Sequence, residues 1–273
     1  MNTKNSLTDF VFIIPTLTNK RGLLDVLSLL DKFYSKKPIV IVNNDKSAAL
    51  EKMVNLKKYK NSILVINNNK NTGFAKACNE GAKLAKKKIN PNYFIFLNDD
   101  TFFYEDWVEK CIKEIRRKHW IATSPLILNT DGTIQNAGFT ILPLGKVKLI
   151  KKINRLARID GIPATALVIK SDIFLKMSGF DENFFAYLED VDLCLRLKKK
   201  GYKFGITTKA QVYHEHMTTS SKMKPFKAYL DFRNWFLVII KNWSREEIVS
   251  NFPAIFIERL RNLWAVVKSL AQL

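Results

Sequence analysis

The N-terminal part of the chain alternates short apolar runs with segments of helical periodicity, and this alternation restricts the fold more than any other feature. The runs are rich in β-branched and aromatic residues, which predicts strands buried on both faces. They cover residues 10–14, 39–42, 63–66 and 93–97. The helix-like segments between them cover about residues 21–34, 47–58 and 73–88. Together they predict an α/β fold with a mostly parallel central sheet flanked by helices, whose ligands bind beyond the carboxyl ends of the strands.

The second half of the chain is less regular. A strand-like run at residues 166–169 and a further strand before His214 are expected to extend the sheet. After Pro225 the composition changes to aromatic and basic residues, which predicts a C-terminal helical appendage. We therefore expect a first domain over residues 1–225 and the appendage over residues 226–273.

The charge of the chain indicates an anionic partner. The sequence has 45 lysines and arginines against 25 acids, a formal net charge of +20, which suits nucleic acid, a phosphorylated substrate or an acidic membrane. Residues 146–158 hold six cations and no acid, so this segment is either a solvated loop or a basic loop beside an anionic ligand. A hydrophobic content of 47% over 273 residues excludes a disordered or fibrous chain.

Three widely spaced cysteines, Cys78, Cys111 and Cys194, favour small core residues in a reducing compartment over a disulfide framework. The first residues contain no apolar leader, and the longest apolar stretches are shorter than the roughly 18 residues of a membrane-spanning helix. We expect a cytoplasmic protein that can bind a membrane surface.

An apolar strand ends in two adjacent carboxylates, Asp99 and Asp100, preceded by Asn98. Their mutual repulsion would be offset by Mg²⁺ or Mn²⁺, because these cations prefer hard oxygen ligands. The alternative is an Asp-rich turn that caps a helix starting near Tyr104. The residues alone leave both interpretations open.

The segment from Asn71 to Gly81 predicts a strand-to-helix entry. Its Gly73 allows a backbone to approach a ligand closely, and free amides at a helix start attract phosphate. The alternative is an ordinary helix entry with a small-residue face packed on the sheet. Because the segment lacks the full G-x-G-x-x-G fingerprint, a nicotinamide enzyme is disfavoured.

Three acids open a helix that is expected to end near Gly201. Asp190 shares an apolar face with Leu193, Cys194 and Leu197, so partial desolvation is expected to raise its pKa and suit it to general-base chemistry. The opposite, polar face is expected to hold Glu189, Asp192, Arg196 and Lys199, with an i,i+4 ion pair between Asp192 and Arg196. The alternative is that all three acids only favour the helix dipole.

Two histidines follow the last predicted strand. His214 and His216 would share one face of an alternating strand, so either one could complete a metal site.

Six elements in chain order, spread over about residues 10–240, carry a resemblance. They are Ile13-Ile14-Pro15-Thr16, Asn71-x-Gly73-Phe74-Ala75-x-Ala77-x-Asn79-x-Gly81, Leu97-Asn98-x-Asp100-Thr101, Gly179-Phe180-Asp181-Glu182-x-Phe184-Phe185, Glu189-Asp190-x-Asp192-Leu193-x-Leu195-Arg196 and Val212-Tyr213-His214-Glu215. With these elements the chain resembles family-2 glycosyltransferases of the GT-A fold, especially the bacterial branch that includes rhamnosyltransferases.

The resemblance implies an inverting glycosyltransferase that moves a sugar from a UDP or dTDP sugar to a glycan or lipid-linked acceptor in bacterial surface polysaccharide synthesis. Residues 1–101 would bind the donor and residues 102–225 the acceptor. Asp190 matches the catalytic base, and Asp100 and His214 match ligands of Mg²⁺ or Mn²⁺. Glu189 and Arg233 are expected to contact the acceptor. The expected donor contacts are Pro15, Thr16, Asn43, Asn71, Gly73, Phe74, Asn79, Asn98 and Asp99.

Two positions depart from the family pattern. Asn98 stands where the D-x-D motif often has its first acid, so it is assigned to donor contact. Asn43 occupies the position where the family usually has an aspartate that reads the nucleobase, so the identity of the base stays open.

Two other classes compete with this interpretation. A sugar-nucleotide pyrophosphorylase also uses an α/β domain and Mg²⁺, but it needs a Gly-rich loop after the first strand, and residues 17–21 contain no glycine. A non-enzymatic basic module would bind nucleic acid or membrane, and salt-dependent binding of DNA or RNA would support it. We expect no nucleic-acid partner.

The appendage has the composition of helices that lie in a lipid headgroup region. Residues 222–273 hold nine basic residues against four acids, with several tryptophans and phenylalanines. We expect residues 226–243 to dock on the first domain and residues 253–272 to meet lipid or a partner chain. This places the protein peripherally on the inner face of the membrane, with oligomerisation through the same helices as the other outcome.

Overall fold

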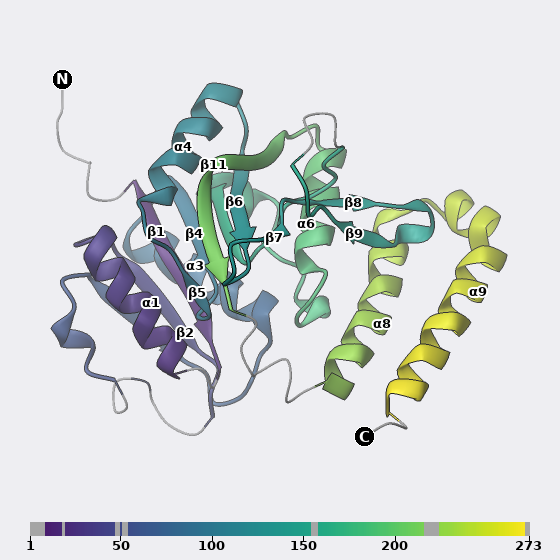
Figure 1. The fold of residues 1–273 in the computed structure, drawn as a ribbon, viewed down its shortest axis with the longest axis horizontal. Helices are drawn as coiled ribbons and strands as arrows, with labels where there is room; N and C mark the ends of the chain where they lie inside the picture. The colour runs from purple at the N-terminus through teal and green to yellow at the C-terminus, as the bar shows by residue number, and fades with distance from the viewer. Residues whose placement is uncertain are drawn as a thin grey trace.

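The structure is a computed structural model, and it describes residues 9–17, 20–46, 50, 54–153, 158–215 and 224–270. Within these residues, nine strands form one mixed sheet and two more form a separate hairpin. Figure 1 shows the sheet at the centre of the molecule, with two C-terminal helices side by side at the end opposite the first helix.

Four neighbouring strands of the sheet, all from the N-terminal part of the chain, are parallel to one another. They run in the order β3 (Ile63–Asn67), β2 (Ile39–Asn43), β1 (Phe10–Thr16) and β4 (Tyr93–Leu97). Each strand lies within two residues of its predicted position. The expectation that all four are buried on both faces is wrong for β3, which is only half-buried because it is the edge strand of the sheet.

The second half of the sheet mixes strand directions. From β4 the order continues through β10 (Ala166–Lys170), β6 (Ala122–Leu128), β11 (Phe204–His214) and β5 (Thr101–Phe102). β10 is antiparallel to both of its neighbours, whereas β6 and β11 are parallel. β7 (Ile134–Asn136) pairs with β6, and β8 (Phe139–Ile141) with β9 (Val147–Leu149) forms the hairpin.

Helices cover both faces of the sheet, as the alternation predicts. Alternate side chains of β1 point to opposite sides of the sheet. Phe12 belongs to the core cluster that contains residues of α1 (Lys20–Phe33) and α4 (Trp107–Lys118). Ile13 belongs to the core cluster on the other side, with residues of α3 (Phe74–Lys88), α5 (Ser171–Lys176) and α6 (Glu189–Lys199). Gly81 of α3 permits close contact, because a Cβ there would lie 2.6 Å from the Ile13 side chain. The three cysteines are buried and free, as expected.

The helix expected at residues 47–58 falls largely outside the described residues. Its described end is a short 3₁₀ helix, η1 (Leu56–Lys58). Two other 3₁₀ helices, η2 (Pro143–Gly145) and η3 (Glu182–Phe184), lie at the tip of the β8–β9 hairpin and before α6.

The C-terminal region forms two long helices, α8 (Lys224–Asn242) and α9 (Arg245–Leu270), that pack on each other. α8 docks on the rest of the chain through Trp235 and Ile239, which are buried with Leu188 and Leu144. The expected docking of residues 226–243 is therefore confirmed. In the described part of the chain, no helix combines the length and hydrophobicity needed to cross a membrane.

Candidate active site

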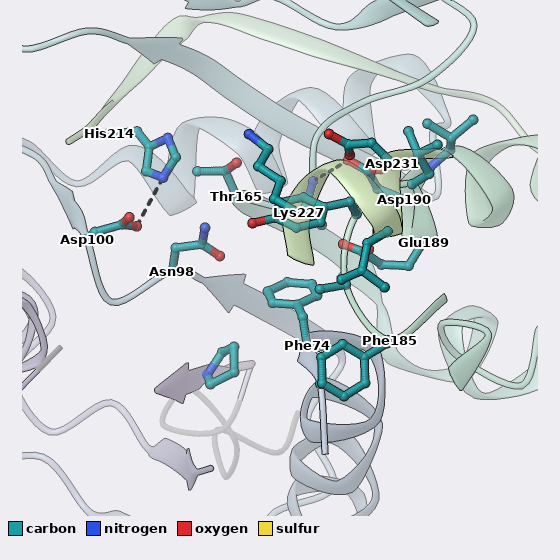
Figure 2. A pocket seen from close by; sticks show the side chains of 18 of the residues that line it. Phe74, Asn98, Asp100, Thr165, Phe185, Glu189, Asp190, His214, Lys227 and Asp231 are labelled. Carbon is teal, nitrogen blue, oxygen red and sulfur yellow. Dashed lines mark hydrogen bonds and ion pairs between the residues drawn. The ribbon is translucent and has the colours of Figure 1, made fainter. Parts of the chain in front are cut away.

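A cavity of about 570 Å³ opens beyond the carboxyl ends of β1 and β4. Its walls come from the strand ends, the β8–β9 hairpin, the segment before α6 and the first turns of α8. Figure 2 shows the polar groups of this cavity in two clusters, with Asp100 and His214 on one side and Glu189, Asp190 and Asp231 on the other. The position matches the edge of the sheet at which ligands were expected.

Strand pairing brings Asp100 and His214 together although 114 positions separate them in the sequence. The short strand β5 pairs with the end of β11, and Thr101 lies opposite His214. As a result, Asp100 Oδ1 lies 3.0 Å from His214 Nε2, and the backbone amide of Glu215 donates to the carbonyl of Asp100. His216 lies outside the described residues.

Gln135 fixes which ring nitrogen of His214 carries the proton in the neutral ring. Its amide nitrogen donates to Asn129 Oδ1 and to the carbonyl of His214, so its Oε1 faces His214 Nδ1 at 2.8 Å and accepts a hydrogen bond from the Nδ1–H group. In the neutral ring, Nε2 therefore turns its lone pair toward the carboxylate of Asp100.

Two facing acceptors need a proton or a cation between them. Asp100 Oδ1 is buried and has no other partner in the described part of the chain. Carboxylate and imidazole both bind Mn²⁺, and Mg²⁺ typically takes one or two protein ligands plus substrate phosphates. The residues present therefore fit a divalent cation, although no group of three or more His, Cys, Asp or Glu side chains gathers among the described residues.

The other two residues of the turn after β4 point into the same cavity. Thr16 at the end of β1 donates a 2.6 Å hydrogen bond to Asp99 Oδ2. Asn98 donates its backbone amide to the carbonyl of Thr165, and its buried side-chain oxygen has no partner among the described residues. Asn98 is thus a polar group available to a ligand.

Asp190 lies at the start of α6, with its carboxylate half-buried at the far side of the cavity. The backbone amides of Ala164 and Val191 donate to its two oxygens at 3.3 and 2.8 Å. Burial raises the pKa of Asp190 to about 6, against the lowering effect of these amides. A carboxylate with this pKa is matched to general-base chemistry near neutral pH, as its apolar helix position predicted.

Glu189 is buried beside Asp190, where the sequence placed it on a polar face with Asp192. That expectation is wrong, because other elements pack on this side of α6: Glu189 and Asp192 are 6% and 1% exposed. Burial and the neighbouring charge of Asp190 raise the pKa of Glu189 well above its ordinary value. The predicted pair of Asp192 with Arg196 forms at 2.7 Å, and Asn242 of α8 also donates to Asp192.

The helix entry at Gly73 is closed by another segment. A Cβ on Gly73 would lie 2.5 Å from the carbonyl oxygen of Phe185, and the amide of Ala75 donates to that same oxygen. The amide of Gly73 donates to Asn71 Oδ1. The expectation of free amides that attract phosphate therefore fails for these two amides, because both already have acceptors.

All but three of the predicted site residues line the cavity; the exceptions are Asn43, Asn79 and Arg233. Asn43 bonds to Asn67 and to the amide of Asp45, and the next residue, Asn44, lines the cavity instead. Asn79 ties α3 to the backbone of Phe180 by two hydrogen bonds.

Arg233 does not face an acceptor space. Its guanidinium donates to the backbone carbonyls of Asn183 and Phe184 and to the side chain of Asn234. The arginine is therefore a backbone clamp, and the sequence could not distinguish the two faces of α8 before its docking surface was known.

The β8–β9 hairpin carries part of the basic segment at residues 146–158. Val147 and Leu149 line the cavity, whereas Lys146 and Lys148 do not, because alternate residues of β9 point to opposite sides. Of the two alternatives for residues 146–158, the described residues favour the solvated loop, because none of their cations lines the cavity; residues 154–157 lie outside the described residues.

Several lining residues were missed by sequence reasoning, chiefly Asn44, Gln135 and the α8 residues Phe226, Lys227, Leu230 and Asp231. Lys227 is the one lysine or arginine among the described lining residues, against five acids, which are Asp99, Asp100, Glu189, Asp190 and Asp231. The cavity is thus acidic although the whole chain is strongly basic. An anionic ligand would need a cation here, and a nucleic-acid backbone would be repelled.

Comparison with solved structures identifies the fold. GalNAc-T7 with UDP, GalNAc and Mn2+ matches with a TM-score of 0.63 at 16% identity, covering 79% of this chain and 45% of that chain. Residues 1–349 of S. aureus TarS in complex with UDP-GlcNAc match with a TM-score of 0.60 at 15% identity, over 92% of this chain and 72% of that chain. The fold is the GT-A fold of glycosyltransferases.

The sequence itself gives the family. The family model for glycosyl transferase family 2 matches residues 11–171, and a model for glycosyl transferase family group 2 matches residues 93–271. The chain belongs to glycosyl transferase family 2.

Two relatives extend over most of the chain. The low-salt glycan biosynthesis hexosyltransferase Agl10 of Haloferax volcanii is 21% identical over 93% of this chain and 83% of its own length. The rhamnosyltransferase WbbL of Escherichia coli strain K12 is 26% identical over 66% of this chain and 73% of its own length. The similarity of this chain to a glycan biosynthesis hexosyltransferase and to a rhamnosyltransferase agrees with the resemblance drawn from the six motifs.

Proposed function

We propose that the chain is an inverting glycosyltransferase that moves a sugar from a nucleoside-diphosphate sugar to a hydroxyl of a glycan or lipid-linked acceptor. One observation carries the proposal: a carboxylate with a raised pKa, Asp190, shares a cavity with the facing pair Asp100 and His214. A base for the acceptor and a cation site for the leaving diphosphate are the two requirements of this reaction.

The reaction is a single displacement. Asp190 accepts the proton of the acceptor hydroxyl as that oxygen forms a bond to the anomeric carbon. The bond between this carbon and the diphosphate breaks, the nucleoside diphosphate leaves with the electron pair, and the anomeric configuration inverts. The amides of Ala164 and Val191 hold the carboxylate in one orientation throughout.

We assign the donor to the strand ends and the turn after β4. Asp100 and His214 would hold Mg²⁺ or Mn²⁺, whose chemistry there is to neutralise charge on the diphosphate. Mn2+ and UDP in the GalNAc-T7 structure, and UDP-GlcNAc in TarS, support a nucleoside-diphosphate sugar as donor, and the UDP or dTDP sugar expected from the resemblance is of this class. Asn44, rather than Asn43, lines this side of the cavity, and its side chain is held by the carbonyl of Gly73 and by Asn68 and Thr72.

We assign the acceptor to the side of the cavity between α6 and α8. Burial and the neighbouring charge of Asp190 raise the pKa of Glu189 well above its ordinary value, which suits this carboxyl to a hydrogen bond with an acceptor or donor hydroxyl. Leu149 and Phe226 form an apolar rim that suits the faces of a glycan. The relatives Agl10 and WbbL support a hexosyl or rhamnosyl transfer in surface polysaccharide synthesis.

A donor screen tests the proposal. Thermal shifts are measured with UDP, dTDP and GDP sugars, each with and without Mn²⁺ or Mg²⁺, because a bound donor stabilises the fold by mass action. We expect a UDP or dTDP sugar to raise the Tm only with the cation. No stabilisation by any sugar nucleotide, together with salt-dependent binding of RNA or DNA, would contradict the proposal.

We also propose that α9 holds the enzyme peripherally on the inner face of the membrane. One side of this helix exposes an apolar stripe of Val249, Phe252, Phe256, Leu260 and Leu263, which are 45–73% exposed. Two of the nine basic residues of this region are engaged within the protein: Arg259 is buried under aromatic rings, and Lys241 pairs with Asp181. Insertion of the apolar stripe, more than charge, would then carry the contact.

A further inference from the structure

The segment that leads into α6 is held in an unusual backbone conformation. Phe185, Tyr187 and Leu188 all have positive φ values, of 65°, 69° and 66°. None of them is glycine, and each such residue costs free energy that the surroundings must offset. The segment ends two residues before Asp190, so its path sets where the carboxylate of Asp190 stands.

The carbonyls of this segment converge on one side chain. Asn234 of α8 is fully buried, and its amide nitrogen lies 2.8 Å from the carbonyl oxygen of Phe184 and 2.7 Å from those of Ala186 and Tyr187. The Asn234 oxygen faces the other way and accepts hydrogen bonds from Arg233. The orientation of the amide is therefore fixed as a donor to the segment.

Other contacts keep α8 docked independently of this amide. Lys241 pairs with Asp181 at 2.6 Å, and Asn242 donates to Asp192 at 2.9 Å. Trp235 and Ile239 add buried apolar surface. Loss of the Asn234 amide would therefore remove the hydrogen bonds to the carbonyls of Ala186 and Tyr187 and loosen this part of the segment, while α6 and α8 stay packed together.

We propose that Asn234 is a positioning residue for the transfer reaction, which holds the segment of Phe185 to Leu188 and through it the carboxylate of Asp190. The inference rests on the proposed function, since it assigns Asp190 the role of base. It also makes α8 a part of the active site, although the sequence sets this helix apart in the appendage.

The test compares Asn234→Ala with Asn61→Ala. Asn61 is a matched control, because it is also buried and donates to two backbone carbonyls, those of Tyr34 and Lys37. Neither of these two residues lines the cavity, whereas Ala186 and Tyr187, which Asn234 holds, both line it. Both variants should lower the Tm. Only Asn234→Ala should lower kcat, by roughly 10–100-fold, because a small displacement of a reacting group has an effect of this size. The KM for the donor should stay within about twofold.

A second variant, Asn234→Asp, keeps the shape of the side chain and separates packing from donation. Its carboxylate would face three carbonyl oxygens, so we expect kcat at or below that of Asn234→Ala. A kcat for Asn234→Ala equal to that of Asn61→Ala, or a wild-type kcat in Asn234→Asp, would overturn the inference. Failure of the proposed function looks different: full transfer by Asp190→Asn would remove it whatever Asn234 does.

Discussion

Asp190 connects the electrostatics of the site with its chemistry. Its pKa is raised to about 6 by burial, so the basic form predominates only above this pH. We predict that kcat falls about tenfold for each pH unit below about 6, as the base is protonated. A pH–rate profile with saturating donor checks this, and a profile that stays flat down to pH 4.5 would contradict the assignment.

The same shift makes a stability prediction. A carboxyl whose pKa is higher in the folded state stabilises the fold when protonated, and this contribution is lost as pH rises through the folded value. Asp190→Asn removes the buried charge, so it should raise the Tm at pH 8 by a few degrees, on the order of 1 kcal/mol, and raise it clearly less at pH 5, which lies between the ordinary and the raised pKa. A Tm that falls equally at both values would show that Asp190 is mainly structural.

His214 and Asp100 are predicted to act through a bound cation. Asp100→Asn and His214→Ala should each weaken the Mn²⁺-dependent thermal shift produced by the donor, because each removes one of two ligands. His119→Ala is the matched control, since His119 is an exposed histidine at the end of α4. An unchanged Mn²⁺ requirement in His214→Ala, with only a lower Tm, would return His214 to a structural role.

At the scale of elements, the entry of α3 and the segment before α6 are interlocked at Gly73. An alanine there meets the carbonyl of Phe185 at 2.5 Å and must also adopt a φ of +84°. Gly201 has a similar φ of +74° but open space around it, so Gly201→Ala isolates the backbone cost of about 1–2 kcal/mol. We predict a loss of about 3 kcal/mol or more for Gly73→Ala in urea unfolding. If Gly73→Ala and Gly201→Ala lost the same free energy of unfolding, the backbone around Phe185 would be able to move away from the added Cβ at little cost.

The regular elements could be predicted because their apolar patterns are local. β1, β2 and β4 are each recognised from one short apolar run, and α3 from its helical periodicity. Which of two successive residues at the end of a strand faces the cavity cannot be read from the local sequence in this way. Both Asn43 and Asn44 are asparagines, and only the final pairing of β2 decides which of the two faces the cavity.

Contacts between distant elements could not be predicted from one sequence. β5 has two residues, too few for any periodic signal, yet its pairing with β11 brings Asp100 to His214. Asp192 is buried against Asn242 of α8, which lies 50 residues further along the chain, so helical periodicity alone assigned this acid to a polar face.

At the scale of the whole molecule, the net positive charge of the chain is not found in the cavity where the reaction is proposed to take place. The chain is strongly basic, yet its cavity is acidic, and the apolar stripe of α9 lies on a helix that packs against α8 rather than on the sheet. The proposed unit for catalysis therefore comprises residues 1–225 together with α8, while α9 is left to bind a surface.

The membrane contact gives a prediction at this scale. Phe252→Glu with Phe256→Glu should abolish flotation with anionic vesicles and leave donor-dependent thermal shifts unchanged. Ser250→Glu with Arg261→Gln is the control, because it changes the charge of exposed α9 positions by the same amount off the apolar stripe. If both pairs float like the wild type, α9 does not insert into lipid, and a Phe252 and Phe256 dependence of oligomeric state would instead indicate a partner chain.

The central claim is that Asp190 is the base of an inverting sugar transfer. The most direct measurement is the single-turnover rate of sugar transfer by Asp190→Asn at saturating donor, metal and acceptor, with donor binding followed in the same samples. We predict that the single-turnover rate of transfer falls by about 10³-fold or more, while the thermal shift induced by the donor persists. Transfer at the wild-type rate with intact donor binding would contradict it.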